Sequence, residues 1–224
     1  MRVLAVDTST MAGGVALLED ARVVGESLLD VRTTHSERLM LAIDRVLTDA
    51  GWEARHLDGL AVAVGPGSFT GLRIGVAAVK GLALALQCPI AAVPTLDAMA
   101  AAFPWAMHAV CPVLHARKHE VYASLYRWDG STMRQEWECL ALSPEALAAR
   151  LTEPVIGVGD GAALVPSPWV TLARPMRRGA SAAALGWLGE ERLRRGDTVA
   201  PTALVPAYLR PSEAELKRRV LTVH

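Results

Sequence analysis

The residues most suggestive of chemistry form a glycine-rich segment, Gly65-Pro66-Gly67-Ser68, between an apolar run and a helical pattern. Glycine allows tight turns and close backbone approach, and a hydroxyl at a helix start can cap free amide groups. A helix N-terminus behind such a turn is suited to bind an anion or to dock a partner. The segment lacks the Gly-Lys-Ser/Thr ending of a Walker loop. Its early proline and the following Ser-Phe-Thr insertion also break the dinucleotide-binding fingerprint.

Two groups of histidine-containing residues have spacings that could support metal or nucleophilic chemistry. His115 and His119 are four residues apart, as metal-binding imidazoles are on a helix. They flank a short segment between two strand-like runs, however, which favours a hairpin turn. His35, Ser36 and Glu37 could form part of a nucleophilic set, but the last two lie in a helix-capping box and no Ser/His/Asp triad stands out. We therefore predict no catalytic residue and no metal site, and a peptidase would lack its nucleophile set.

Composition narrows the class of protein. The chain has 224 residues, 52% of them hydrophobic, with 23 basic and 23 acidic side chains and a formal net charge of zero. A strongly basic nucleic-acid binder is therefore disfavoured, and we interpret the local basic clusters at 174–178, 192–195 and 217–219 as solvated faces.

The cysteines and the apolar segments indicate a compartment. Cys88, Cys111 and Cys139 are odd in number and lack metal-ligand spacing, which fits idle thiols in a reducing cytoplasm. We expect a cytoplasmic protein with no signal peptide and no membrane association.

The order of predicted elements indicates an α/β protein. Strand-like apolar runs and helical spacings alternate in the first half, and a second series of strands begins near residue 104, which suggests a duplicated fold. The predicted strands are 3–9, 14–18, 22–28, 60–64, 90–93, 110–114, 121–126, 133–137 and 155–158, and the predicted helices are 34–50, 70–86, 95–102, 143–151, 180–195 and one from 212.

These elements carry motifs that resemble the TsaB (YeaZ) family of actin/hexokinase-like proteins. The matching motifs are Leu4–Ser9, Thr34–Arg38, Val64–Gly75, Val93–Leu96, Ala116–Tyr122 and Pro206–Arg210. The resemblance implies a two-lobed, ribonuclease H-like duplicated fold with mixed central sheets flanked by helices. The expected first lobe is 1–104, with a C-terminal helix at 205–224 packing back on it, and the smaller second lobe is 105–204.

The resemblance also implies a function in tRNA processing. A TsaB-like chain is expected to be a non-catalytic subunit that forms a heterodimer with a TsaD-like protein and works with a TsaE-like ATPase. The complex would transfer a threonylcarbamoyl group to the adenosine beside the anticodon of tRNAs reading ANN codons, so this chain would meet tRNA indirectly. A homodimer of the isolated chain is left open. The alternative is an independent ATP-dependent kinase or carbamoyltransferase of the same fold.

For nucleotide binding, the resemblance points to the end of the first strand. Asp7 stands where this superfamily keeps the aspartate of its first phosphate loop, but it could instead cap the turn that it begins. A second loop is expected near His115, where relatives commonly have aspartate, and Thr95 and Met99 stand where TsaD carries metal-binding histidines. We therefore expect no cofactor held by this chain alone, with ATP at or near the partner interface. The residues of a residual nucleotide site would be Asp7, Thr8, Ser9, Gly65, Gly67 and Ser68.

The predicted helices at 37–50 and 70–86 are candidates for partner docking. Gly71, Gly75 and Ala78 recur at spacings of three and four, which lets another helix, or this chain's own sheet, approach closely. In the resembling family the two helices pair with those of TsaD or of a second TsaB in a helical bundle. The predicted partner-binding residues are Met40, Ile43, Leu47, Gly71, Ile74, Gly75 and Ala78.

Overall fold

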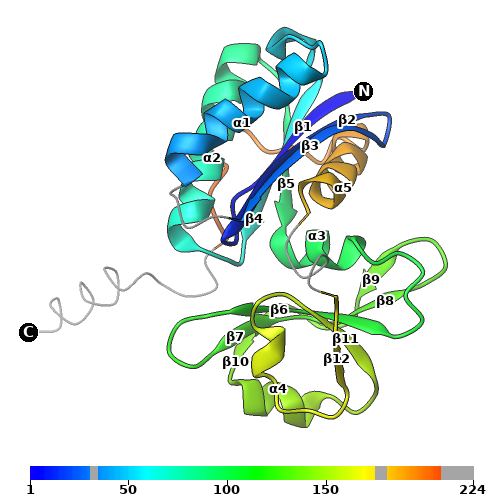
Figure 1. Cartoon of the computed structure of the whole chain (residues 1–224). Helices are drawn as coiled ribbons and strands as arrows, with labels where there is room; N and C mark the ends of the chain where they lie inside the picture. Colours follow the sequence, from blue (N-terminus) through cyan, green and yellow to red (C-terminus); the bar gives the residue numbers. More distant parts are fainter. Residues whose placement is uncertain (31–34, 175–180, 208–224) are drawn as a thin grey trace, which may run out of the picture.

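The computed structural model describes residues 1–30, 35–174 and 181–207. These residues form two lobes, each built on its own β-sheet, as Figure 1 shows. The capping box expected at 34–37 and the C-terminal helix expected from 212 lie outside the described residues and side chains.

The first lobe contains a mixed sheet in the order β3-β2-β1-β4-β5. Its strands are β1 (Arg2–Asp7), β2 (Ala12–Glu19), β3 (Arg22–Asp30), β4 (Gly59–Gly65) and β5 (Ile90–Pro94). Strands β1 to β3 are antiparallel, whereas β4 and β5 run parallel to β1. Each parallel connection needs a crossover, and α2 (Phe69–Leu86) supplies the one from β4 to β5. Helices α1 (His35–Asp49) and α2 cover one face of the sheet, and α5 (Ala182–Arg194) covers the other (Figure 1).

Successive side chains along each strand point to opposite faces of the sheet. Leu60 and Val62 of β4 join the apolar cluster under α1 and α2, while Ala61 and Ala63 join the cluster under α5. The sheet face under α5 includes several alanines, which lets this helix lie very close to the sheet. A Cβ atom at Gly189 would collide with the side chain of Ala61.

The second lobe contains β6 (Ala109–His115) at its centre, with β11 (Val155–Val158) parallel to it. The remaining strands are short: β7 (Val121–Ala123), β8 (Tyr126–Trp128), β9 (Met133–Gln135), β10 (Leu140–Leu142) and β12 (Val170–Leu172). Helix α4 (Pro144–Arg150) flanks this sheet, and α3 (Thr95–Ala101) lies between the lobes (Figure 1). The single strand predicted at 121–126 is interrupted at Ser124 and Leu125, so β7 and β8 pair separately with β6.

The position of α5 corrects the expected division of the chain. The expected second lobe spans 105–204, but α5 packs against β1, β2, β4 and β5 of the first sheet. Its buried residues, including Leu185 and Leu193, belong to the apolar cluster of that sheet. The chain therefore returns to the first lobe after the second, and the helical pattern alone does not show to which sheet it returns.

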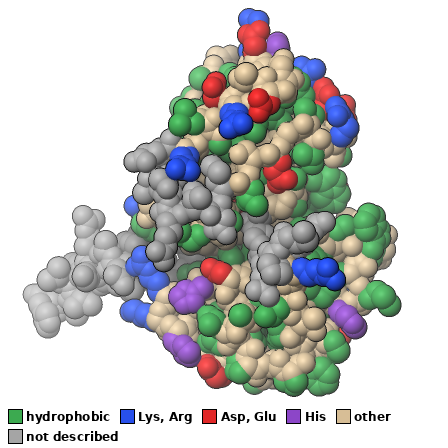
Figure 2. Space-filling model, viewed as in Figure 1, with side chains coloured by type: hydrophobic (Ala, Val, Ile, Leu, Met, Phe, Trp, Pro, Cys, Tyr) green, Lys and Arg blue, Asp and Glu red, His purple; other side chains and the backbone are tan. Residues whose placement is uncertain are grey.

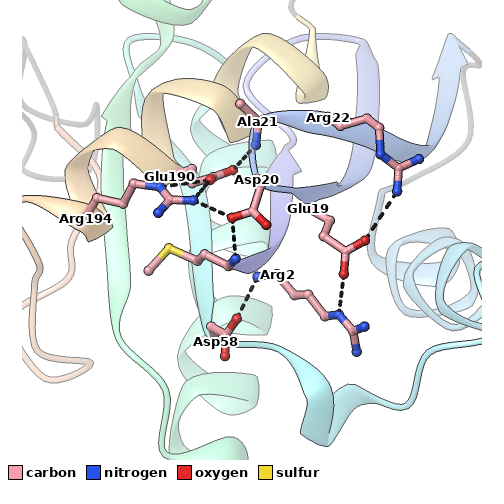
Figure 3. A network of polar contacts seen from close by, with 9 residues as sticks. Arg2, Glu19, Asp20, Ala21, Arg22, Asp58, Glu190 and Arg194 are labelled. Atoms are coloured by element: carbon pink, nitrogen blue, oxygen red, sulfur yellow. Dashed lines mark hydrogen bonds and ion pairs between the residues drawn. The ribbon is translucent and has the colours of Figure 1, made fainter.

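A polar network ties α5 to the turn between β2 and β3 (Figure 3). The buried Glu190 carboxylate accepts hydrogen bonds from the amide of Ala21 (2.8 Å) and from the Arg194 guanidinium (2.6 Å). Asp20 and Ala21 both have positive φ angles, 50° and 63°, so the network supports a turn that few residues adopt easily. The Met1 amino group and Arg194 lower the pKa of Asp20.

We predict that Glu190→Gln destabilises the protein by about 1–3 kcal/mol, because a neutral amide cannot replace both charge-assisted contacts of a buried carboxylate. The matched control is Glu191→Gln on the same helix, whose ion pair with Arg195 is longer, at 3.7 Å, and more exposed. We expect the control to stay within about 0.5 kcal/mol of the parent. Urea unfolding of both variants measures the difference, and equal effects would contradict the role given to Glu190.

Candidate functional site

The end of β1 and the start of α2 are joined by direct hydrogen bonds. The Thr8 hydroxyl donates to the carbonyl oxygen of Gly71 (2.7 Å), and the Ser68 amide donates to the carbonyl oxygen of Ser9 (2.6 Å). Ser68 also caps α2, since its hydroxyl accepts from the Gly71 amide at 3.2 Å. The turn after β1 and the glycine-rich segment therefore form one unit, which we call the glycine corner (residues 7–9 and 65–75).

Three glycines make this close contact possible. A Cβ atom at Gly67 would collide with the carbonyl oxygen of Ser9. A Cβ atom at Gly71 or Gly75 would collide with Thr8, at its carbonyl oxygen or its hydroxyl respectively. The close backbone approach that the glycine-rich sequence suggested is thus present, and the surface it meets belongs to this chain. Gly71 and Gly75 lie inside the first lobe, so the structure does not place them on a docking surface.

Asp7 has the contacts of a turn-capping residue. Its Oδ1 atom accepts hydrogen bonds from the amide (2.8 Å) and the hydroxyl (2.6 Å) of Ser9. The exposed fractions of Asp7, Thr8 and Ser9 are only 1%, 2% and 1%. Of the other predicted nucleotide-site residues, Gly65 is buried, Gly67 is half-buried and Ser68 is exposed. The structure brings all six residues together, and the side chains of residues 7–9 make hydrogen bonds within the chain.

His115 and His119 lie at the hairpin between β6 and β7, as the sequence predicted. The Ala116 amide donates to the carbonyl oxygen of Glu120, and β6 and β7 pair on either side of the turn. The backbone amide of His115 donates to Asp160 Oδ1 (2.8 Å), and His119 Nε2 lies 3.2 Å from Glu145 Oε1. Among the described residues, no three His, Cys, Asp or Glu side chains cluster closely enough to hold a metal ion.

The predicted docking residues divide between the interior and the surface. Ile43 and Leu47 are buried in the cluster beneath α1 and α2, and Ile74 and Ala78 pack against it. Met40 is 49% exposed. The sequence reasoning missed Leu41 and Leu84, which are 69% and 67% exposed. The available signal was that both are large apolar residues outside the buried stripe of their helices.

Helix α2 has an apolar outer side as well as a buried one. Val76, Val79 and Ala83 face the sheet, while Ala77, Gly81, Leu84 and Ala85 are exposed. By length and composition α2 could cross a membrane, with a mean hydropathy of 1.5 and 33% of its residues buried, but a core helix meets the same test. Acidic and basic side chains intermingle on the visible face of the first lobe, with no broad field of one sign (Figure 2).

Comparison with known proteins places this geometry in a family. A family model described as TsaD: tRNA N6-adenosine threonylcarbamoyltransferase matches residues 30–217. The tRNA threonylcarbamoyladenosine biosynthesis protein TsaB of Bacillus subtilis is 32% identical, with 97% of each chain covered. The TsaB protein of Escherichia coli is 34% identical over 91% of this chain and 83% of its own. The chain belongs to the TsaB family.

Solved structures agree with this assignment. YeaZ from Pseudomonas aeruginosa has a TM-score of 0.78 and 31% identity, covering 92% of this chain and 100% of its own. A P. aeruginosa protein described as uncharacterized, with similarity to peptidase YEAZ, has a TM-score of 0.81 and 32% identity, covering 93% and 99%. Component A of the Acidaminococcus fermentans (R)-2-hydroxyglutaryl-CoA dehydratase shares the fold alone, at 12% identity and a TM-score of 0.52, covering 87% and 99%. The expected TsaB-like, actin/hexokinase-type α/β fold is confirmed.

Replacing glycine by alanine is expected to have opposite effects at two positions of α2, one inside the glycine corner and one outside it. Gly71→Ala should destabilise the protein by about 2 kcal/mol or more, because its Cβ meets backbone that cannot move freely. Gly81→Ala should stabilise it by about 0.5–1 kcal/mol, because that position has open space around it and alanine favours a helix. Thermal or urea unfolding tests both variants. A Gly71→Ala variant as stable as the parent would show that the corner is not closely packed.

Proposed function

We propose that this chain is the non-catalytic subunit that scaffolds a TsaD-like threonylcarbamoyltransferase during tRNA threonylcarbamoyladenosine biosynthesis. Membership of the TsaB family supports the pathway. The observation that carries the scaffolding role is a set of exposed apolar residues on α1 and α2, which we call the outer helical face: Met40, Leu41, Ala77, Gly81, Leu84 and Ala85. The same helices also expose charged residues, among them Arg38, Asp44, Arg45 and Arg73.

The outer helical face has the chemistry of a helix-docking surface. Ala77, Gly81 and Ala85 are four residues apart, so their short side chains would let a second helix approach α2 closely. Met40, Leu41 and Leu84 supply large apolar groups of the kind that gain most from burial in an interface. An interface for a stable heterodimer buries about 1,200–2,000 Å² in total, centred on such side chains.

In this proposal the chemistry takes place on the partner. The TsaD-like subunit transfers the threonylcarbamoyl group to the tRNA adenosine, a TsaE-like ATPase joins the complex, and ATP binds at or near the shared interface. The present chain meets tRNA through the complex and contributes apolar surface rather than reacting groups. The isolated chain can use the same face to form a homodimer.

The alternative is an independent kinase or carbamoyltransferase. Such an enzyme needs phosphate-binding groups that a nucleotide can reach. The Asp7, Thr8 and Ser9 side chains are buried, and both Ser9 donors are engaged by Asp7. This burial favours the scaffolding role.

We predict that Met40→Glu weakens binding of the TsaD-like partner by roughly 30-fold or more, as expected when a charge enters the apolar centre of an interface. The matched control is Met107→Glu in the second lobe, where the side chain is already 95% exposed. Titration calorimetry with each variant measures the change, and circular dichroism verifies that both remain folded. If the two variants bind equally well, the interface lies elsewhere.

We also predict that the purified chain alone turns over no ATP and forms no modified tRNA. A working enzyme would show turnover of about 1 per second or faster. Phosphate release is measured with several divalent metals, and modified nucleoside is quantified by mass spectrometry. Turnover that persists through repurification would support the enzyme alternative instead.

A further inference from the structure

Helix α3 connects the two lobes through apolar contacts. Leu96, Met99 and Ala100 pack in one cluster with Val110 and Tyr126 of the second sheet. The same helix packs against α5 of the first lobe, and the chain passes from α3 into β6 (Figure 1). The relative orientation of the lobes therefore depends on what holds this short helix.

One side chain of α3 makes polar contacts with both lobes. The hydroxyl of Tyr126, on β8, donates a hydrogen bond to Asp97 Oδ1 at 2.7 Å. On the other side, Arg192 Nη2 of α5 lies 3.7 Å from Asp97 Oδ2. Arg192 is itself fixed to the first sheet, because its Nη1 atom donates to the carbonyl oxygen of Ala92 on β5 at 3.0 Å.

The environment of this bridge favours a fixed geometry. Tyr126 is buried, and the side chains of Asp97 and Arg192 are about three-quarters buried, at 27% and 28% exposure. Burial and the neighbouring carboxylate raise the pKa of Tyr126 far above its ordinary value, so its phenol remains the donor. Burial raises the pKa of Asp97, against the opposing effects of the Tyr126 hydroxyl and the Arg192 guanidinium. The hydrogen bond between Tyr126 and Asp97 is shielded from water, which strengthens it.

We propose that Asp97 is a latch that holds the two lobes in one orientation through Tyr126 and Arg192. The latch keeps the second lobe at a constant distance from α1 and α2. It goes beyond the proposed scaffolding function and does not depend on it, since its test uses the isolated chain.

The latch is tested by measuring the distance between the lobes. Nitroxide labels are attached to p-acetylphenylalanine at positions 45 on α1 and 171 on β12, both exposed, which avoids the three native cysteines. Electron–electron double resonance, on labelled chain diluted into unlabelled chain so that only distances within one molecule are measured, then gives the distance distribution for the parent and for Tyr126→Phe and Asp97→Asn. We expect one narrow peak for the parent and a distribution about twofold wider for each variant, because freed lobes rotate about the connecting segments.

The matched control is Asp197→Asn, which removes a different partner of Arg192, 3.3 Å away and 64% exposed, that does not bridge the lobes. We expect the control to keep the narrow parental peak. Circular dichroism identifies any variant that fails to fold, and Tyr126→Phe, which removes a single hydroxyl, carries the test if Asp97→Asn is lost. Narrow peaks of the same width for the parent and the folded latch variants would overturn the proposal.

Discussion

The close packing of Thr8 against Gly71 and Gly75 is the contact on which the rest of the first lobe depends. It requires two glycines on one side of α2, and it places the start of that helix directly on the turn after β1. The polar groups of this turn then bond within the chain: Asp7 accepts a hydrogen bond from Ser9, and Thr8 donates one to Gly71. With this side of α2 turned inward, its other apolar side faces out beside α1. The inner contact and the outer surface are thus two consequences of one orientation of the helix.

This arrangement supports the proposed non-catalytic role, because the side chains at the end of β1 are buried and bond within the chain. A phosphate loop presents amides and hydroxyls to a ligand. In the glycine corner the Ser9 amide and hydroxyl donate to Asp7, and the Thr8 hydroxyl donates to the carbonyl oxygen of Gly71. A subunit that has no catalytic residues can still control a reaction by positioning a partner that carries them. The proposed latch at Asp97 is consistent with this kind of role, because it would give a scaffold a constant shape.

Much of the fold could be predicted from the sequence, for identifiable reasons. Strands β1 and β4 are buried on both faces and read as continuous apolar runs, and α2 is long and bounded by Ser68. Strands β10 and β12 have three residues each and are half-buried or exposed, too short for a periodic signal. The candidate site was harder to predict from the sequence. Helical spacing shows that Ile43, Leu47 and Gly71 share apolar faces, but not that these faces pack inward while Leu41 and Leu84 remain outside. That choice is made by the sheet, through contacts between residues far apart in the chain.

The proposed function requires this chain to activate a partner and not to catalyse a reaction of its own. It is tested most directly by reconstituting tRNA modification from purified components: the TsaD-like protein, the TsaE-like ATPase, the threonylcarbamoyl donor, ATP and unmodified tRNA, with and without this chain. Mass spectrometry of the digested tRNA then quantifies threonylcarbamoyladenosine. We expect modified nucleoside only when this chain and the TsaD-like protein are both present. Full modification without this chain, or modification by this chain without the TsaD-like protein, would contradict it.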